Sequence, residues 1–235
     1  MRKIILTIFI LINTLLTNNQ TSSQTLTDTL STTINTNQQS ASDSITSPTE
    51  PLRLTDEDYE IVANNLGIEV AVIKAVSAIE AGPNHKGFVE PGKPTLYFSV
   101  NMFKQNLRKR NINVSTSTRS TSPAFLSLNK KKYGSSGKAH HARLESALEI
   151  DTISAILSCY WGMFQIAGFN WKQCGCESPQ EFAKKMSESE FAQLQLFANF
   201  VSNNKMLKHL KAKNWYAFAR IYNGKYAKSY ANKMA

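Results

Sequence analysis

The sequence WGMFQIAGFN, at residues 161–170, is the segment that best indicates the fold and the functional site of this chain. Gln165 is a polar residue in an apolar neighbourhood, where it needs hydrogen-bond partners, and this favours a functional role. Gly162 permits a close approach to its backbone. Trp161 and Phe164 could equally be core residues or contacts of a bound molecule.

A second informative segment, residues 67–82, contains Glu80. Its spacing predicts a helix with one buried face, formed by Ile68, Val72, Ala75, Val76 and Ile79. Because Gly82 and Pro83 end this helix, Glu80 lies in its last turn, where the unsatisfied carbonyl groups favour a protonated carboxyl group. Such a group near neutral pH is what a general acid needs. The alternative is an ordinary solvated glutamate at a helix end.

Length and composition predict one folded domain behind an N-terminal targeting segment. The 235 residues are 42% hydrophobic, enough for a single core. Residues 1–20 contain Arg2 and Lys3 before a short apolar run, which is typical of a signal peptide, with an uncleaved membrane anchor as the alternative. Residues 21–51 are rich in Ser, Thr, Asn and Gln and predict a flexible linker. We therefore expect residues 52–235 to form the domain, secreted or periplasmic.

The charge of the chain favours anionic partners. Residues 51–235 contain 25 basic and 14 acidic residues, a net charge of +11. An exported domain of this charge should associate transiently with anionic surfaces of the cell envelope. We do not expect nucleic acid as a partner, because the export signal separates the protein from it. The basic residues are also spread along the chain, apart from the runs at 108–110 and 130–132.

The cysteines and histidines predict neither a metal site nor a cofactor. With three cysteines, at least one thiol stays unpaired in the expected monomer, and Cys159 with Cys174 is the pairing we would guess. Cys174 and Cys176 lack a second metal-ligand pair at useful spacing. The four histidines form no recognisable ligand pattern either: His85, His140, His141 and His209.

The remaining pattern is mostly helical. Thr55 and Asp58 predict a capped helix that ends at Leu66 before Gly67. Further helices are expected over 143–148, 152–157 after Asp151, 179–186 after Ser178, from 190 with Ser187 and Glu190 as a capping box, and 215–222 between Asn214 and Asn223-Gly224. Residues 96–103 predict a short strand or a helix start, and residues 111–138 a basic insertion of uncertain structure.

The order of these segments resembles a known enzyme superfamily. Glu80 at a helix end, then residues 161–166, then Tyr222-Asn223-Gly224 are similar to the goose-type lysozymes and soluble lytic transglycosylases. Residues 54–234 as a whole resemble the N-acetylmuramidase family of phage endolysins and exported bacterial muramidases. The matching pieces are residues 75–80, 142–147, 161–170, 182–194 and 215–224. The resemblance implies a mainly α, lysozyme-like α+β fold, a single helical domain with a small β element around the cleft.

The same resemblance implies the activity and the roles of individual residues. Peptidoglycan glycan strands would be the substrate, cleaved between N-acetylmuramic acid and N-acetylglucosamine, with Glu80 donating the proton. Gln165 would bind an N-acetyl group or a hydroxyl, and Gly162 would let the chain approach closely. The remaining substrate contacts would come from the stacked rings of Trp161 and Phe164 and from a floor made by Tyr222 and Asn223.

Two departures from the family pattern keep alternatives open. Ser99 follows Phe98 where the family usually has glutamate, and Ala81 follows Glu80 where it has serine. A second catalytic carboxylate is not identifiable, with Glu90, Glu145 and Asp151 as candidates. A lytic transglycosylase that forms 1,6-anhydro products, or an inactive peptidoglycan-binding module, therefore stands beside the muramidase.

Overall fold

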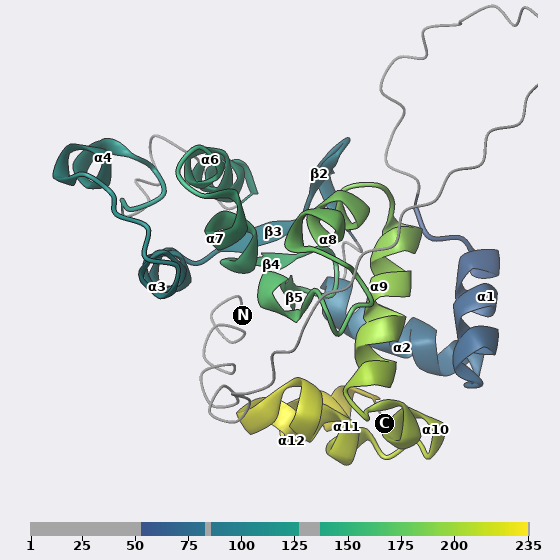
Figure 1. Cartoon of the computed structure of the whole chain (residues 1–235). Coiled ribbons are helices and arrows are strands. Elements are labelled where there is room, and N and C mark those ends of the chain that lie inside the picture. The colour runs from purple at the N-terminus through teal and green to yellow at the C-terminus, as the bar shows by residue number, and fades with distance from the viewer. Residues whose placement is uncertain (1–52, 83–85, 127–136, 235) are drawn as a thin grey trace, which may run out of the picture. The chain divides into compact units, whose positions relative to one another are not determined.

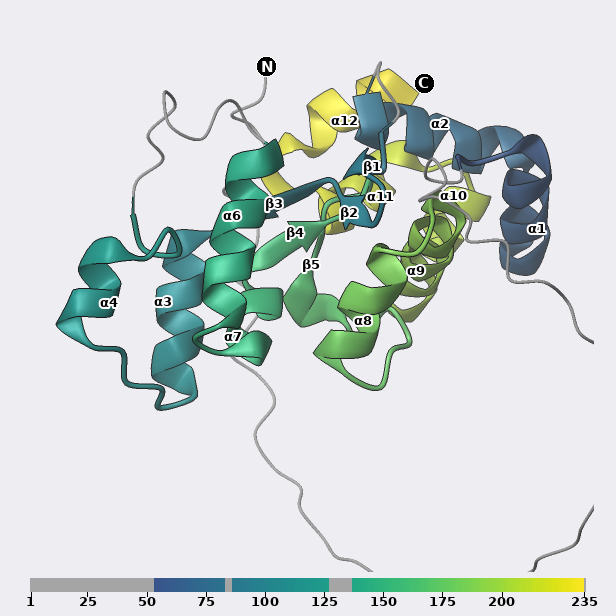
Figure 2. The same cartoon turned by 90° about the horizontal axis from the view of Figure 1, so that it is seen from above.

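The computed structural model describes residues 53–82, 86–126 and 137–234, which belong to one compact unit, residues 48–235. The fold of this unit is mainly helical with two small sheets, which confirms the predicted fold class (Figures 1 and 2). The predicted signal peptide and linker lie outside the described residues. The division of the chain into segments therefore stays a prediction.

The helices and strands follow one another along the chain in the order of their labels. They are α1 (Asp56–Leu66), α2 (Val70–Ala81), β1 (Phe88–Glu90), β2 (Lys93–Pro94), β3 (Leu96–Phe98), α3 (Val100–Lys109), α4 (Thr116–Thr121), α6 (Gly137–Leu148), α7 (Thr152–Leu157), β4 (Cys159–Trp161), β5 (Ile166–Ala167), the short 3-10 helix η3 (Gly168–Asn170), α8 (Pro179–Met186), α9 (Glu190–Asn203), α10 (Leu207–Lys211), α11 (Trp215–Tyr222), the 3-10 helix η4 (Gly224–Tyr226) and α12 (Ala227–Met234).

Helix α1 begins and ends where the sequence predicts, whereas α2 ends before Gly82 as predicted but begins only at Val70, so that Ile68 lies outside it. The Thr55 hydroxyl accepts a hydrogen bond from the Asp58 N–H, and the Asp58 carboxylate accepts one from the Thr55 N–H, which completes a capping box at α1. Gly67 ends α1 with φ +61°. In α2, Val72 and Val76 are buried while Ala75 and Ile79 are partly buried, which confirms four positions of the predicted apolar face; Ile73 is buried as well and was not predicted.

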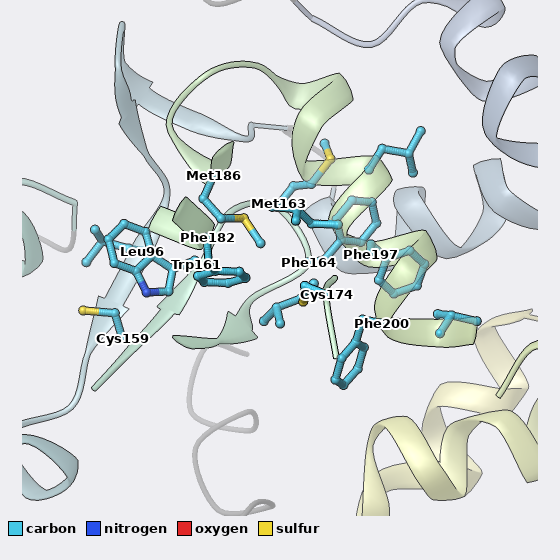
Figure 3. Close-up of a cluster of buried hydrophobic side chains, with 14 of the residues drawn as sticks. Leu96, Cys159, Trp161, Met163, Phe164, Cys174, Phe182, Met186, Phe197 and Phe200 are labelled. Carbon is cyan, nitrogen blue, oxygen red and sulfur yellow. The ribbon is translucent and has the colours of Figure 1, made fainter. Parts of the chain in front are cut away.

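Helix α9 supplies much of the core around the later strands. Its buried residues lie on nearly every turn: Glu190, Gln193, Leu194, Leu196, Phe197, Ala198, Phe200 and Val201. It packs against α1 on one side and α8 on another (Figure 1). Figure 3 shows Phe197 and Phe200 of α9 in the same buried cluster as Trp161, Phe164 and Phe182. Residues 161–164 are thus built into the core beside this helix.

Strands β3, β4 and β5 form an antiparallel sheet, in that order. Leu96 pairs with Trp161 and Phe98 with Cys159, and these buried side chains lie on the core face. Tyr97 pairs with Tyr160 on the opposite face. Residues 96–103 contain both elements that the sequence left open, because the strand ends at Phe98 and Ser99 caps α3 by accepting from the Met102 N–H.

Two predictions about the later helices need correction. The cap of α9 is Ser189, whose hydroxyl accepts from the Ala192 N–H, whereas Ser187 ends α8 and donates to the Ala183 carbonyl. The Glu190 carboxylate does not close a capping box, because it accepts from the Gly87 and Leu54 N–H groups. The sequence also missed α12, and it missed the short helix α4 within the basic insertion, part of which lies outside the described residues.

Across the described ranges, no single helix is long and apolar enough to span a membrane. Helices α1 and α2 would meet the length and composition criteria only as a pair, with a bend of 115° between them.

Candidate active site

Glu80 lies in the last turn of α2, as predicted, and Gly82 ends the helix with φ +66°. The side chain is half-buried, so part of the carboxyl group remains accessible while protein surrounds the rest. Burial raises the pKa of Glu80 from 4.5 to about 7, and nearby polar and positive groups oppose this rise. The carboxyl group is therefore protonated over the acidic half of the pH range and is able to donate a proton near neutrality.

The groups that oppose the rise come from the C-terminal end of the chain. The hydroxyls of Tyr230 and Tyr222 and the charge of Lys233 each lower the pKa of Glu80. Tyr230 is 6% exposed, and its hydroxyl has no partner that meets hydrogen-bond geometry in the described part of the chain. It is close enough to act on the Glu80 carboxyl group because α12 packs against α2 (Figure 2). Neither Tyr230 nor Lys233 was predicted from the sequence.

Tyr222 connects Glu80 to the segment at residues 162–165. Its hydroxyl donates to the Phe164 carbonyl at 2.9 Å, and burial together with the charge of Glu80 raises its own pKa well above the ordinary value. Its ring stacks on Phe218 at a centroid distance of 5.4 Å and meets Phe197 edge-on at 5.7 Å. Tyr222 is thereby fixed between the helix-end glutamate and the turn, as expected for part of one site.

The turn at residues 162–165 has a strained backbone. Gln165 has φ +48°, which is uncommon for a residue other than glycine. Its side-chain nitrogen donates to the Gly162 carbonyl at 2.8 Å, and its side chain is partly exposed. This bond orients the Gln165 amide, and no described residue bonds its oxygen. The amide is therefore placed to accept a hydrogen bond from a ligand beside the turn.

Gly162 is required by packing within the fold. It has φ +70°, and a Cβ atom at this position would lie 2.7 Å from the Gln193 side-chain oxygen. Gln193 is fully buried on α9, accepts from the Met163 N–H, and donates to the Gly87 and Met186 carbonyls. The predicted close approach at Gly162 thus occurs with a side chain of the protein itself. Gln193 holds the turn in place and was also missed from the sequence.

The predicted stacking of Trp161 and Phe164 on sugar rings is wrong. Trp161 is 3% exposed, donates from its indole nitrogen to the Ile156 carbonyl and meets Phe182 edge-on. Phe164 is 2% exposed and stacks on Phe197 at 4.3 Å. Figure 3 shows both rings within the core. They are core residues, the alternative that the sequence had left open, and they support the turn from beneath.

Asn223 is half-buried at the end of α11, where its N–H donates to the Ala219 carbonyl. It directly follows Tyr222 and precedes η4, so its position at the boundary of the two helices agrees with the sequence. Its predicted contact with substrate stays a prediction.

The three candidates for a second carboxylate all have other partners. Glu90 pairs with Lys93 and Lys138, and Glu145 lies 3.9 Å from Lys93. Asp151 caps α7 through the Ser154 N–H and pairs with Arg110. Of the described groups, only the cation Lys233 and the two tyrosine hydroxyls act on the Glu80 pKa besides burial. Ser99, at the position of the missing family glutamate, serves as the cap of α3.

The guessed disulfide between Cys159 and Cys174 is also wrong, because all three thiols are free and buried. The Cys159 sulfur contacts the Ala155 carbonyl at 3.5 Å, and Figure 3 shows Trp161 and Phe182 between it and Cys174. Burial raises the pKa of Cys159 and of Cys174, which makes both poor nucleophiles. Within the described ranges, no group of three or more His, Cys, Asp or Glu side chains could hold a metal ion.

Comparisons with known proteins agree with this arrangement. The family model described as N-acetylmuramidase matches residues 69–235, which contain Glu80, the 162–165 turn and α12. The solved structure of the Burkholderia AP3 phage endolysin is 34% identical, with a TM-score of 0.63, over 77% of this chain and 68% of that chain. A search of curated protein sequences found no match. The chain therefore belongs to the N-acetylmuramidase family and is a peptidoglycan-cleaving enzyme with a lysozyme-like fold.

Proposed function

We propose that this protein is a glycosidase that cleaves the β-1,4 bond between N-acetylmuramic acid and N-acetylglucosamine, with Glu80 as its general acid. The observation that carries the proposal is the half-buried Glu80 carboxyl group, whose pKa burial raises to about 7. An acid with a pKa near the working pH is protonated often enough to react and releases its proton readily. The other described carboxylates discussed above are committed to caps or ion pairs.

In this mechanism, protonated Glu80 donates to the glycosidic oxygen as the bond to the anomeric carbon breaks. The leaving sugar keeps the proton as a hydroxyl group, and the other sugar becomes an oxocarbenium-like centre. Glu80 is left as a carboxylate beside that positive centre. Burial keeps the acid protonated at first, whereas the Tyr222 and Tyr230 hydroxyls and Lys233 favour the charged form that remains after proton transfer.

Substrate would be oriented mainly by polar groups. The oriented Gln165 amide can accept from an N-acetyl N–H or a sugar hydroxyl, and Asn223 lies beside Tyr222 to add a second polar contact. The buried rings of Trp161 and Phe164 keep the turn rigid without touching sugar. Rigid support of this kind keeps the bound glycan near the geometry that proton donation requires.

A lytic transglycosylase is the second candidate. The observation that favours it is that no described carboxylate acts on Glu80 to complete a pair. Without a second carboxylate, the 6-hydroxyl of the muramic acid can attack its own anomeric carbon and return its proton to Glu80, which gives a 1,6-anhydro end with no water consumed. Attack by the acetamido group followed by water would instead give a reducing end.

We further propose that the enzyme acts as a monomer, secreted or in the periplasm, where peptidoglycan is accessible. The support for this location is the sequence pattern of residues 1–20 and the basic charge of the domain.

Mass spectrometry of fragments released from purified peptidoglycan tests these proposals. Wild type is compared with Glu80→Gln and with Glu60→Gln, the same change at an exposed position of α1. We expect reducing muramic acid ends from wild type and Glu60→Gln and none from Glu80→Gln. Anhydro ends in the same pattern would establish the transglycosylase, and equal release by Glu80→Gln would refute the role of Glu80. Binding of wall material without release by any variant would indicate a binding module.

A further inference from the structure

A basic pocket lies between α3 and α4, at a distance from the candidate active site. It has a volume of about 300 Å³, near the lower end for small-molecule sites. In both Figure 1 and Figure 2, α3 and α4 lie at one end of the domain, apart from α2 and α12, which carry Glu80 and Tyr230. The residues that line the pocket are Lys104, Leu107, Arg108, Ile112, Arg119 and Phe125.

The pocket has an apolar floor and a cationic rim. Leu107 and Phe125 are buried and Ile112 is half-buried, whereas the three basic residues are exposed. Leu126, which directly follows Phe125 in the chain, is 40% exposed. Among the described residues, no carboxylate lines the pocket. This combination matches a ligand that has a negatively charged head and an apolar part.

Both arginines of the rim are held in place by backbone carbonyl groups. Arg108 Nε donates to the Lys104 carbonyl at 3.3 Å, and Arg119 Nε donates to the Val114 carbonyl at 3.1 Å. The Arg119 guanidinium also lies 6.0 Å from the centre of the Phe125 ring. Each arginine uses Nε internally, so the two terminal nitrogens remain for a bidentate contact with an oxyanion.

The three cations of the rim have no ion-pair partner among the described residues. By contrast, nearby Arg110 pairs with Asp151 at 3.0 Å, and Lys93 lies near two glutamates. Three unpaired positive charges around one pocket repel one another, and a bound anion would remove that repulsion. The pocket is therefore electrostatically suited to a phosphate group.

We propose that this pocket binds the phosphate-bearing headgroup of an anionic lipid, so that the α3–α4 end of the domain docks on a membrane surface. The rim cations bind the phosphate, and the floor together with Leu126 contacts the glycerol backbone and the first methylene groups. A soluble polyphosphate-type polymer would satisfy the rim but leave the floor in water. This docking is independent of the chemistry at Glu80, and it gives the +11 domain a defined orientation on the envelope.

Vesicle co-sedimentation of the full chain tests the proposal. The probes are phosphatidylcholine vesicles with and without phosphatidylglycerol. The pocket variant is Arg108→Gln with Arg119→Gln, and the matched control is Arg53→Gln with Arg220→Gln, two exposed arginines elsewhere. We expect wild type to bind only the anionic vesicles and the pocket variant to bind about thirtyfold more weakly, from the usual contribution of each basic residue near an anionic membrane. The control should change by less than about threefold.

A third variant, Leu126→Gln, tests the apolar contact without a change of charge and should weaken binding several-fold. Equal loss in the pocket and control variants would overturn the proposal in favour of net charge alone. Failure of wild type to bind anionic vesicles, or binding of soluble polyphosphate in preference to vesicles, would overturn it as well. Release of fragments from soluble peptidoglycan should be unchanged in the pocket variant, which separates this test from that of Glu80 and confirms that the variant is folded.

Discussion

Replacing Glu80 by glutamine should stabilise the fold at neutral and alkaline pH. Because burial raises the pKa of Glu80 in the folded protein from 4.5 to about 7, the unfolded chain ionises this group at a lower pH than the folded protein does. The wild type is then most stable, as far as this group is concerned, below pH 4.5, and it loses stability as the pH rises towards 7. Glutamine does not ionise, so the Glu80→Gln variant avoids that loss.

The size of the effect follows from the displacement of the pKa. Each pKa unit corresponds to about 1.36 kcal/mol, so a rise from 4.5 to about 7 gives an advantage of about 3 kcal/mol to the variant above pH 7. This is an upper value because part of the carboxyl group is exposed to solvent. The advantage should be small near pH 4. For a domain of this size it corresponds to a rise in melting temperature on the order of 10 °C.

Urea unfolding of wild type and Glu80→Gln from pH 4 to pH 8 measures this difference. Glu60→Gln, an identical change on the exposed surface of α1, is the control and should differ little from wild type at every pH. A difference between Glu80→Gln and wild type that does not grow with pH would refute the argument that Glu80 is held with a raised pKa. Loss of activity in the same variant, together with its higher stability, would be typical of a catalytic group.

Three further substitutions test the surroundings of Glu80 and of the turn. Tyr230→Phe removes a hydroxyl that lowers the pKa of Glu80. The pKa of Glu80 should therefore rise, and the alkaline limb of the activity–pH profile should move to higher pH. An unmoved limb, or an equal shift in the exposed control Tyr216→Phe, would contradict this role. Gln193→Leu leaves the buried Met163 N–H and Met186 carbonyl without partners, whereas the Gly87 carbonyl still accepts from the Thr95 N–H. It should lower the free energy of unfolding by about 2–4 kcal/mol, measured with urea. A loss below about 1 kcal/mol would show that the network is dispensable. Gly162→Ala should lower the free energy of unfolding more than Gly92→Ala does. Both glycines have φ +70°, but only at Gly162 would the new Cβ meet another atom. Equal losses of stability in the two variants would mean that backbone strain alone causes the destabilisation.

Elements with local signals were predicted well from the sequence. The Thr55 cap, the Gly67 stop, the Asn214 cap and the last-turn position of Glu80 all depend on residues within a few positions of one another. The cap of α9 was misassigned because Ser187 and Ser189 both offer a hydroxyl before the same apolar run. The Glu190 carboxylate accepts hydrogen bonds from the N–H groups of Leu54 and Gly87, which are far away in the sequence. It therefore cannot close a capping box with Ser187, and Ser189 caps the helix instead.

The surroundings of Glu80 could be predicted only in part. The turn at 162–165 and Tyr222 had recognisable patterns, but Tyr230 and Lys233 act on Glu80 because α12 packs on α2. No local spacing indicates such a contact between the two ends of the domain. The burial of Trp161 and Phe164 likewise depends on α9, since an aromatic residue beside a turn looks the same in sequence whether another helix covers it or not.

Gln193 and Glu190 also determine when the active site can form. The hydrogen bonds of Gln193 join positions 106, 30 and 7 residues apart, and those of Glu190 span 103 and 136 residues. Contacts between such distant positions form only after the cost of closing the intervening loops has been met. Leu54 before α1, Gly87 after α2 and Met163 in the 162–165 turn are therefore joined only when α9 docks, and we expect this step late in folding. A chain that has folded only its first half carries Glu80 without the partners that would let it cleave, so catalytic competence arrives together with the complete fold.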